Sequence, residues 1–154
     1  MVIVDTREKP RAIRQILAEF DRRGVKYVRR ALNFADYFCP DNPQVIIDRK
    51  QCLMEVANNV TTDRKRFVRE IERCYRAGCH LIVLVEHGNS VKRLEDVAKW
   101  HNPRLKESPL AVSGERLFRI MRAMELYYGI EWQFCNKQST GRKIIELLGV
   151  EKDE

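Results

Sequence analysis

Two hydrophobic patterns alternate along this chain. Apolar runs at residues 2–4, 25–32, 81–85 and 130–135 predict strands. The run at 81–85 reads LIVLV, without a single polar position, and this is typical of a central strand that is covered on both faces. Between the runs, apolar residues recur three and four positions apart, which is the spacing of amphipathic helices.

The predicted helices have recognisable starting residues and glycines at their ends. They begin near Pro10, Gln51, Asp63, Ser113 and Thr140, and four of them end at Gly24, Gly78, Gly129 and Gly149. A further helix is predicted at 89–99, and a loop with two prolines at 100–112. Strands and helices in this alternation predict an α/β fold, with a central mixed β-sheet and helices on both of its faces.

A β-hairpin is predicted at residues 33–50, NFADYFCPDNPQVIIDRK, because two apolar runs flank a PDNP turn. If the strands pair through this turn, Asp36 lies opposite Asp48 with Cβ atoms within about 5 Å. The period of two along a strand then puts Lys50 on the same face as Asp48 and the Arg49 side chain on the other. A shift of one residue would instead turn Asp48 away.

The amino-acid composition indicates the kind of partner and the cell compartment to expect. The 154 residues contain 29 Lys and Arg against 22 Asp and Glu, a net charge of +7 that favours a polyanionic partner. No apolar run approaches the roughly 18 residues of a membrane helix, and the N-terminus has no signal-peptide pattern. Five cysteines without CxxC spacing predict reduced thiols. We therefore expect one cytoplasmic domain over residues 1–154 and no membrane partner.

Acidic residues gather at the ends of the predicted strands. Asp5 ends the first strand, Glu8 follows it, and Asp36 and Asp48 lie in the hairpin. Carboxylates that are packed together raise one another's pKa unless a cation neutralises them, and Mg²⁺ or Mn²⁺ takes such oxygen ligands. The expected metal ligands are the carboxylates of Asp5, Asp36 and Asp48 and the backbone carbonyl of Arg49.

A metal beside a lysine in a basic cleft predicts phosphodiester hydrolysis. The cation would polarise the scissile phosphate and acidify a bound water, while Lys50 would orient that water or help to deprotonate it. The Arg49 side chain would hold neighbouring groups or phosphate.

Four motifs in order carry a family resemblance: IVDTRE at 3–8, ADY at 35–37, DRK at 48–50 and LIVLVE at 81–86. In order and spacing, residues 1–86 resemble the nuclease domain of the XPF-type structure-specific endonucleases, which belong to the PD-(D/E)-x-K superfamily. The resemblance implies a restriction-endonuclease-like fold and the active-site set Asp5, Glu8, Asp36, Asp48 and Lys50, with Arg7 and Arg49 in support. Single-domain versions from bacteria and phages look similar, which implies a bacterial cell or a phage-infected host.

The sequence departs from the family pattern at several positions. Ala35 replaces the usual glycine, Asp48 replaces glutamate, and the acid expected four positions after the lysine is Met54, with Glu55 one step later. Arg66 and Phe67 stand where the family has an Arg-Leu pair. Residues 87–154 have no tandem helix-hairpin-helix module, and we interpret them as a helical and strand extension of the core 1–86.

Nucleic-acid contacts are assigned to Arg7, Arg49, Lys65, Arg66 and Arg69. On the helix that begins near Asp63, basic residues alternate with Glu70 and Glu72, so a solvated face is an equally good interpretation of that row.

The leading hypothesis is a metal-dependent DNA endonuclease that acts on branched or flapped DNA in replication, recombination or repair. The alternative is a catalytically silent subunit of the same fold that binds DNA or a partner, and an RNA-binding or restriction-type nuclease also stays open. The helix after Ser113 has more apolar surface than one stripe needs, and Trp132 and Phe134 follow it. We expect a homodimer through this C-terminal half.

Overall fold

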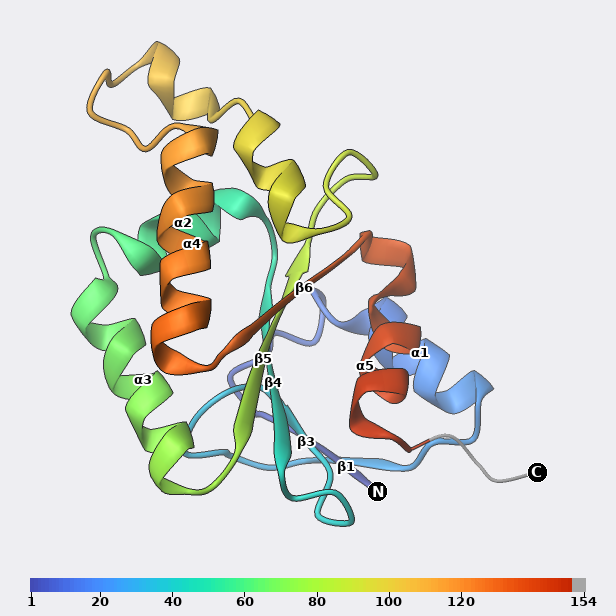
Figure 1. Ribbon diagram of the computed structural model, residues 1–154. Coiled ribbons are helices and arrows are strands. Elements are labelled where there is room, and N and C mark those ends of the chain that lie inside the picture. Colours follow the sequence, from blue (N-terminus) through green and yellow to red (C-terminus); the bar gives the residue numbers. More distant parts are fainter. Residues whose placement is uncertain (151–154) are drawn as a thin grey trace.

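The fold is built on one six-stranded sheet in the order β2-β1-β3-β4-β5-β6. The computed structural model describes residues 1–150, so the last four residues of the predicted domain lie outside it. The strands are β1 (Val2–Val4), β2 (Tyr27–Arg29), β3 (Tyr37–Phe38), β4 (Val45–Lys50), β5 (His80–Glu86) and β6 (Glu131–Cys135) (Figure 1).

Strand directions make this sheet mixed, as predicted. The short strand β3 runs antiparallel to both of its neighbours, β1 and β4. The other neighbouring pairs are parallel: β1 with β2, β4 with β5, and β5 with β6. The carboxyl ends of β4, β5 and β6 therefore meet at one edge of the sheet, and the residues that follow these strands are brought together there.

Helices cover both faces of the sheet (Figure 1). One face carries α2 (Leu53–Val60), α3 (Arg64–Arg76) and α4 (Gly114–Tyr128), and the other carries α1 (Arg14–Arg22) and α5 (Thr140–Leu148). Strand β5 supplies both cores, because Leu81, Val83 and Val85 pack on the first side whereas Ile82 and Leu84 pack on the second. The LIVLV run is therefore a central strand covered on both faces, as its composition predicted.

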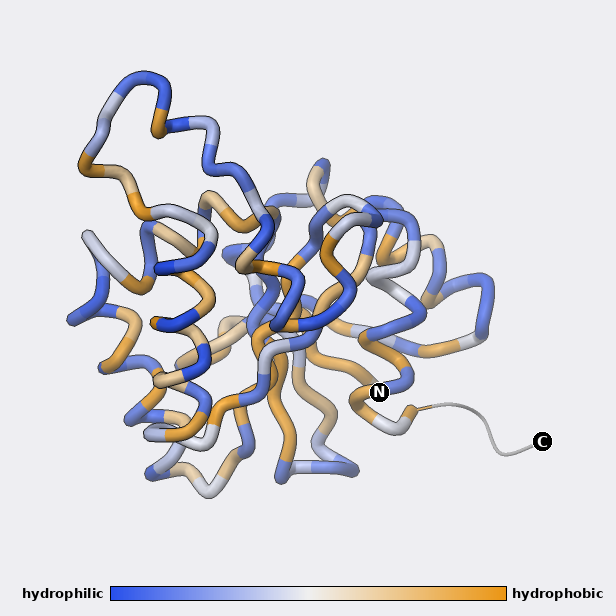
Figure 2. The backbone as a smooth tube through the Cα atoms, turned by 45° about the horizontal axis from the view of Figure 1, so that its top comes forward, coloured by the Kyte–Doolittle hydropathy of each residue, from blue (hydrophilic) through white to orange (hydrophobic). Residues whose placement is uncertain are grey.

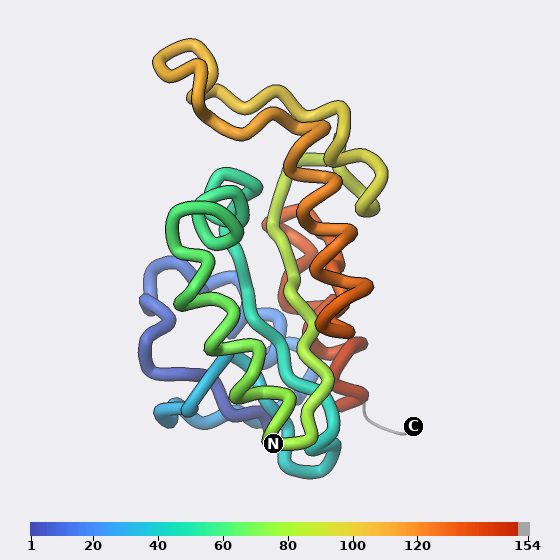
Figure 3. The backbone as a smooth tube through the Cα atoms, turned by 60° about the vertical axis from the view of Figure 1, so that its left-hand side comes forward, coloured from blue at the N-terminus to red at the C-terminus, as the bar shows by residue number. Residues whose placement is uncertain are grey.

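Hydropathy follows these layers. Hydrophobic segments lie where the helices meet the sheet, whereas the segment between β5 and α4 is mostly hydrophilic (Figure 2). That segment reaches beyond the end of the sheet (Figure 3). No helix within residues 1–150 has the length and apolar character needed to cross a membrane.

The segment between β5 and α4 is where the predicted elements differ most from the structure. In place of a helix over 89–99 there is a turn followed by a short 3-10 helix, η1 (Leu94–Lys99). The Asp96 carboxylate accepts hydrogen bonds from the amides of Lys92 and Arg93, so the helical turn begins only after these residues. The predicted loop contains another 3-10 helix, η2 (Pro103–Lys106), because Asn102 caps it with its side chain.

The ends of α4 agree with the prediction. The Ser113 hydroxyl accepts a hydrogen bond from the amide of Arg116, and Gly129 ends the helix with a φ of 72°. Helix α1 begins at Arg14, four residues later than expected, and β2 has only three residues of the predicted run. A further 3-10 turn, η3 (Lys137–Ser139), joins β6 to α5.

Candidate active site

The hairpin of β3 and β4 has the predicted register. Tyr37 pairs with Ile47, and the Asp36 amide donates to the carbonyl oxygen of Ile47 at 2.9 Å. Asp36 lies one residue before this ladder, and its carboxylate comes close enough to Asp48 for the charge of Asp48 to raise the pKa of Asp36. One Asp36 oxygen, Oδ2, accepts a hydrogen bond from the Arg49 amide at 2.7 Å, which turns this carboxylate toward the end of β4.

Alternation along β4 separates two sets of charged side chains. Asp48 and Lys50 lie on the face that packs against α3, where Lys50 Nζ is 3.1 Å from Asp48 Oδ2 and 5.3 Å from the centroid of the Phe67 ring. Arg49 points to the opposite face. The lysine is therefore held between a carboxylate and an aromatic ring, with its ammonium group beside Asp48.

A cleft of about 250 Å³ opens at this point, and its walls carry five acids, Glu8, Asp36, Asp48, Glu55 and Glu70, together with the basic residues Arg7, Lys9, Arg49 and Lys50. A larger cavity of about 490 Å³ lies at the start of β5, with Cys74, Tyr75, Cys79 and Tyr128 in its wall. No carboxylate lines that larger cavity, so the smaller cleft is the better candidate for hydrolytic chemistry.

Buried carboxylates of the cleft lie close enough together to raise the pKa of Asp36 and that of Glu70. Burial, and then the charge of Asp48, raise the pKa of Asp36 well above its ordinary value. Burial and Asp48 also raise the pKa of Glu70. Burial by itself would lower the pKa of Lys50, but the negative charges around it, first that of Asp48, outweigh this effect and raise it. Lys50 is therefore a cation at neutral pH.

The Asp48 carboxylate is buried and has few polar partners. Its Oδ2 atom is buried and has no hydrogen-bond donor among the described residues, and its close partner is the Lys50 ammonium group. The Asp36 carboxylate lies close to that of Asp48, and a further cation in the cleft would relieve the repulsion between the two.

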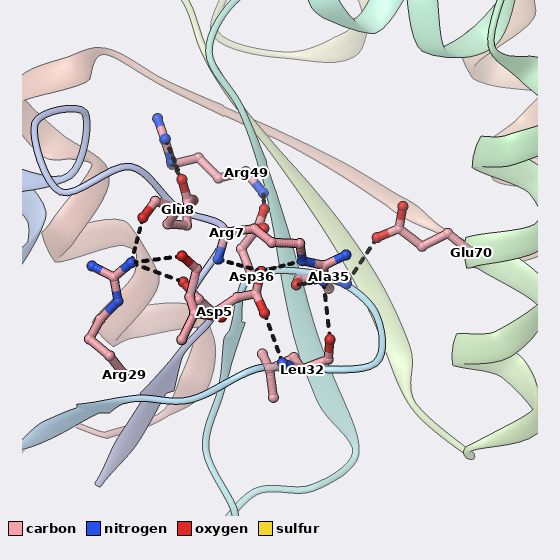
Figure 4. Close-up of polar contacts among 10 residues, drawn as sticks. Asp5, Arg7, Glu8, Arg29, Leu32, Ala35, Asp36, Arg49 and Glu70 are labelled. Carbon is pink, nitrogen blue, oxygen red and sulfur yellow. Dashed lines mark hydrogen bonds and ion pairs between the residues drawn. The ribbon is translucent and has the colours of Figure 1, made fainter.

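Asp5 does not line this cleft, and its role as a metal ligand stays a prediction. Its side chain is fully buried and its oxygens are already used (Figure 4). Oδ1 accepts from the Leu32 amide at 2.8 Å, and Oδ2 accepts from Arg7 Nε at 2.6 Å. The carboxylate that ends β1 therefore orders the neighbouring loop.

Glu8 and Arg49 form a buried ion network on the other face of β4. Arg49 Nε and Nη2 donate to the two Glu8 oxygens at 2.8 and 2.6 Å, and Nη1 donates to Glu86 Oε1 at 2.9 Å. The Arg49 side chain is only 2% exposed. It cannot contact a phosphate without leaving this network, so the predicted nucleic-acid contact of Arg49 does not fit the structure.

The other predicted DNA-contacting residues are on the surface. The side chain of Arg7 is 63% exposed at the edge of the cleft, and Lys65, Arg66 and Arg69 are exposed on α3. Three acids of the site were not predicted to function there. Glu86 ends the LIVLV strand, and Glu55 follows the lysine by five positions. Glu70 was interpreted as part of a solvated helix face, although it lies three positions after the buried Phe67.

The residues present fit a cation held by few protein ligands. Within residues 1–150, no group of three or more His, Cys, Asp or Glu side chains is arranged to hold a metal. Asp36 and Asp48 provide two carboxylates, and the backbone of Arg49 lies beside them. Mg²⁺ commonly uses one or two protein carboxylates and keeps several waters, so this pair is sufficient.

Comparison with known proteins identifies the family of this chain. The model of the ERCC4 domain matches residues 4–147, and the chain belongs to this family. No curated protein matches the sequence. The predicted resemblance to XPF-type nuclease domains is thereby confirmed.

Two solved structures are similar to this chain. One is XPF from Aeropyrum pernix, with a TM-score of 0.65 and 22% identity over 99% of this chain and 62% of that chain. The other is XPF from Aeropyrum pernix in complex with DNA, with a TM-score of 0.67 and 22% identity over 97% of this chain and 63% of that chain. The chain spans less than two thirds of either structure. At this identity the likeness establishes the fold, which is the predicted one.

Proposed function

We propose that this protein is a metal-dependent DNA endonuclease, and that its active site is the cleft containing Asp36, Asp48 and Lys50. The observation that supports this most is the buried Asp48 carboxylate, which raises the pKa of the neighbouring Asp36 and pairs with Lys50 at 3.1 Å. Membership of the ERCC4 domain family supports the same conclusion.

Asp36, Asp48 and the backbone carbonyl of Arg49 would hold Mg²⁺ or Mn²⁺. When bound, the ion would polarise the scissile phosphate and lower the pKa of a water. The chain's own contribution is to keep two carboxylates side by side at the end of β4. Burial is the first cause of the raised pKa of Asp36, and binding of a cation would offset the second, the charge of Asp48.

Lys50 supplies positive charge to the reaction. Because its pKa is raised, its ammonium group donates hydrogen bonds at neutral pH, to a phosphate oxygen or to the attacking water. Asp48 and the Phe67 ring fix the direction of this donor. Glu8 and Glu86 hold Arg49 on the opposite face and thereby keep the end of β4 in place.

DNA is the proposed substrate, and branched or flapped DNA the proposed structure. The exposed side chains of Arg7, Lys65, Arg66 and Arg69, near the cleft or on α3, would contact the phosphate backbone. A DNA complex exists for the similar structure of XPF from Aeropyrum pernix, which supports a DNA partner. All five cysteines are free, which supports the cytoplasm as the proposed location.

The experiment is incubation of the purified protein with labelled flap, fork, junction and linear DNAs, with Mg²⁺, with Mn²⁺ and with a chelator. We expect cleavage of a branched substrate with metal and none with the chelator. If the protein binds these DNAs but cuts none of them under either metal, it is a silent subunit of the same fold. If it cuts only RNA or only linear DNA, the proposed substrate is wrong.

A further inference from the structure

The residue that precedes Asp36 has a strained backbone. Ala35 has a φ of 61°, and it is the only residue other than glycine with a positive φ within residues 1–150. The left-handed region is unfavourable for a residue with a Cβ atom, so this conformation persists only where the surroundings impose it. The strand ladder ends at Asp36, whose amide pairs with Ile47 and whose carbonyl pairs with the Asp5 amide. Strand pairing therefore does not determine the conformation of Ala35.

Side chains hold Ala35 from two sides (Figure 4). On one side, Glu70 of α3 accepts a hydrogen bond from the Ala35 amide at 2.9 Å. On the other side, Arg7 Nη2 lies 3.5 Å from the Ala35 carbonyl oxygen and donates to the Leu32 carbonyl at 3.1 Å. Arg7 is itself fixed by the fully buried Asp5.

We propose that Glu70 is a positioning residue, which ties α3 to Ala35 and so fixes how the chain delivers Asp36 to the cleft opposite Asp48. This inference rests on the proposed nuclease function. Glu70 acts through the peptide of Ala35 and does not hold the cation. One of its oxygens is committed to the Ala35 amide, and no three-acid metal group is present among the described residues.

Two substitutions of Glu70 separate the effect of its side-chain length from the effect of its charge. Glu70→Gln keeps an acceptor oxygen at the same reach and removes the charge, whereas Glu70→Asp keeps the charge and shortens the side chain by one methylene. Positioning predicts that Glu70→Gln keeps most of the wild-type kcat/KM, and that Glu70→Asp loses about 10- to 100-fold. Glu72→Asp, on the exposed face of the same helix, is the matched control and should lose no activity.

Relieving the backbone strain at Ala35 should independently restore activity to the Glu70→Asp variant. Glycine adopts a positive φ without penalty, so adding Ala35→Gly to Glu70→Asp should restore at least about five-fold in kcat/KM. Thermal unfolding of each variant separates a folding defect from a loss of positioning. If Glu70→Asp is more active than Glu70→Gln, the charge matters and the inference is overturned. It is also overturned if Ala35→Gly gives no recovery in a folded double variant.

Hydrogen exchange does not depend on catalysis, so it tests this inference separately from the proposed function. In the metal-free protein, hydrogen exchange of the Ala35 amide should stay slow in Glu70→Gln and become at least about ten-fold faster in Glu70→Asp, because the acceptor is then out of reach. If the wild type cuts no DNA while this pattern holds, the proposed function fails and the contact is established. Equal exchange in both variants would refute the contact itself.

Discussion

At the scale of single residues, strand geometry made part of the site predictable. The PDNP turn and the period of two along β4 were enough to bring Asp36 and Asp48 together and to put Lys50 beside them. The direction of Asp5 was not predictable in this way. Its partners, Arg7 and Leu32, lie in loops whose course depends on the finished fold. The role of Glu70 was left open because a helix face of alternating charges has the same pattern whether water or a cleft faces it.

The raised pKa of Asp36 predicts how stability depends on pH. Below the unfolded-state pKa of about 3.9, both the folded and the unfolded chain carry the proton, and Asp36 contributes nothing. Between that pH and the raised folded-state pKa, only the unfolded chain releases the proton, so the free energy of unfolding falls as pH rises. Asp36→Asn removes this penalty.

We therefore expect metal-free Asp36→Asn to be more stable than the wild type at neutral pH and equally stable near about pH 3, as measured by urea unfolding. Saturating Mg²⁺ should reduce the difference, because it stabilises only the wild-type carboxylate pair. A variant that is less stable than the wild type at neutral pH would show that the carboxylates do not repel one another.

Asp5→Asn distinguishes an ordering role from metal binding. The amide nitrogen of asparagine cannot accept from the Arg7 amide or from Arg7 Nε, so two of the three hydrogen bonds at this carboxylate are lost and the free energy of unfolding should fall by about 1–3 kcal/mol. Mn²⁺ should still bind, as measured by calorimetry, because Asp5 does not line the cleft. Loss of Mn²⁺ binding without loss of stability would restore Asp5 as a ligand.

At the scale of elements, the sequence predicted the long and strongly patterned segments best. Helices α3, α4 and α5 and strands β4 and β5 were found because their apolar stripes or runs match one period over many residues. The 3-10 helix η1 was predicted as a longer helix and η2 as a loop, because both are stabilised by individual side-chain caps at Asp96 and Asn102, which leave no periodic signal.

The contact between α4 and η1 gives a prediction about packing. A Cβ atom on Gly114 would lie 2.1 Å from the Trp100 carbonyl oxygen and 2.8 Å from that of Val97, so backbone must move to admit it. Gly114→Ala should lower the free energy of unfolding by about 1–3 kcal/mol in denaturant titration. Gly88→Ala is the control, because nothing lies within 4 Å of its added Cβ. Equal stability of the two variants would mean that α4 and η1 are less closely packed than described.

At the scale of the whole molecule, one sheet and two helical layers bury most of the residues that suggested a dimer interface. Trp132 and Phe134 are 5% and 8% exposed and belong to the core beside α3 and α4. What stays on the surface of α4 is a smaller apolar pair, Leu126 and Tyr127, which are 77% and 81% exposed. The proposed homodimer would use this pair.

The dimer proposal predicts a mass that depends on concentration. We expect the wild type to sediment as a dimer at micromolar concentration, and the double variant Leu126→Ser, Tyr127→Ser to sediment as a monomer with little change in stability. Leu110→Ser, which removes an 89% exposed side chain outside α4, should stay dimeric. A monomeric wild type over the whole micromolar range would exclude this interface.

The most direct measurement of the central claim compares cleavage by the wild type and Asp48→Asn on the same branched DNA in Mn²⁺. The substitution keeps the volume of the side chain and removes the charge beside Lys50, so we expect the cleavage rate to fall by at least about 100-fold while DNA binding survives. Asp41→Asn, in the exposed turn of the same hairpin, should cut at the wild-type rate. If Asp48→Asn cuts as fast as the wild type, this cleft is not the active site.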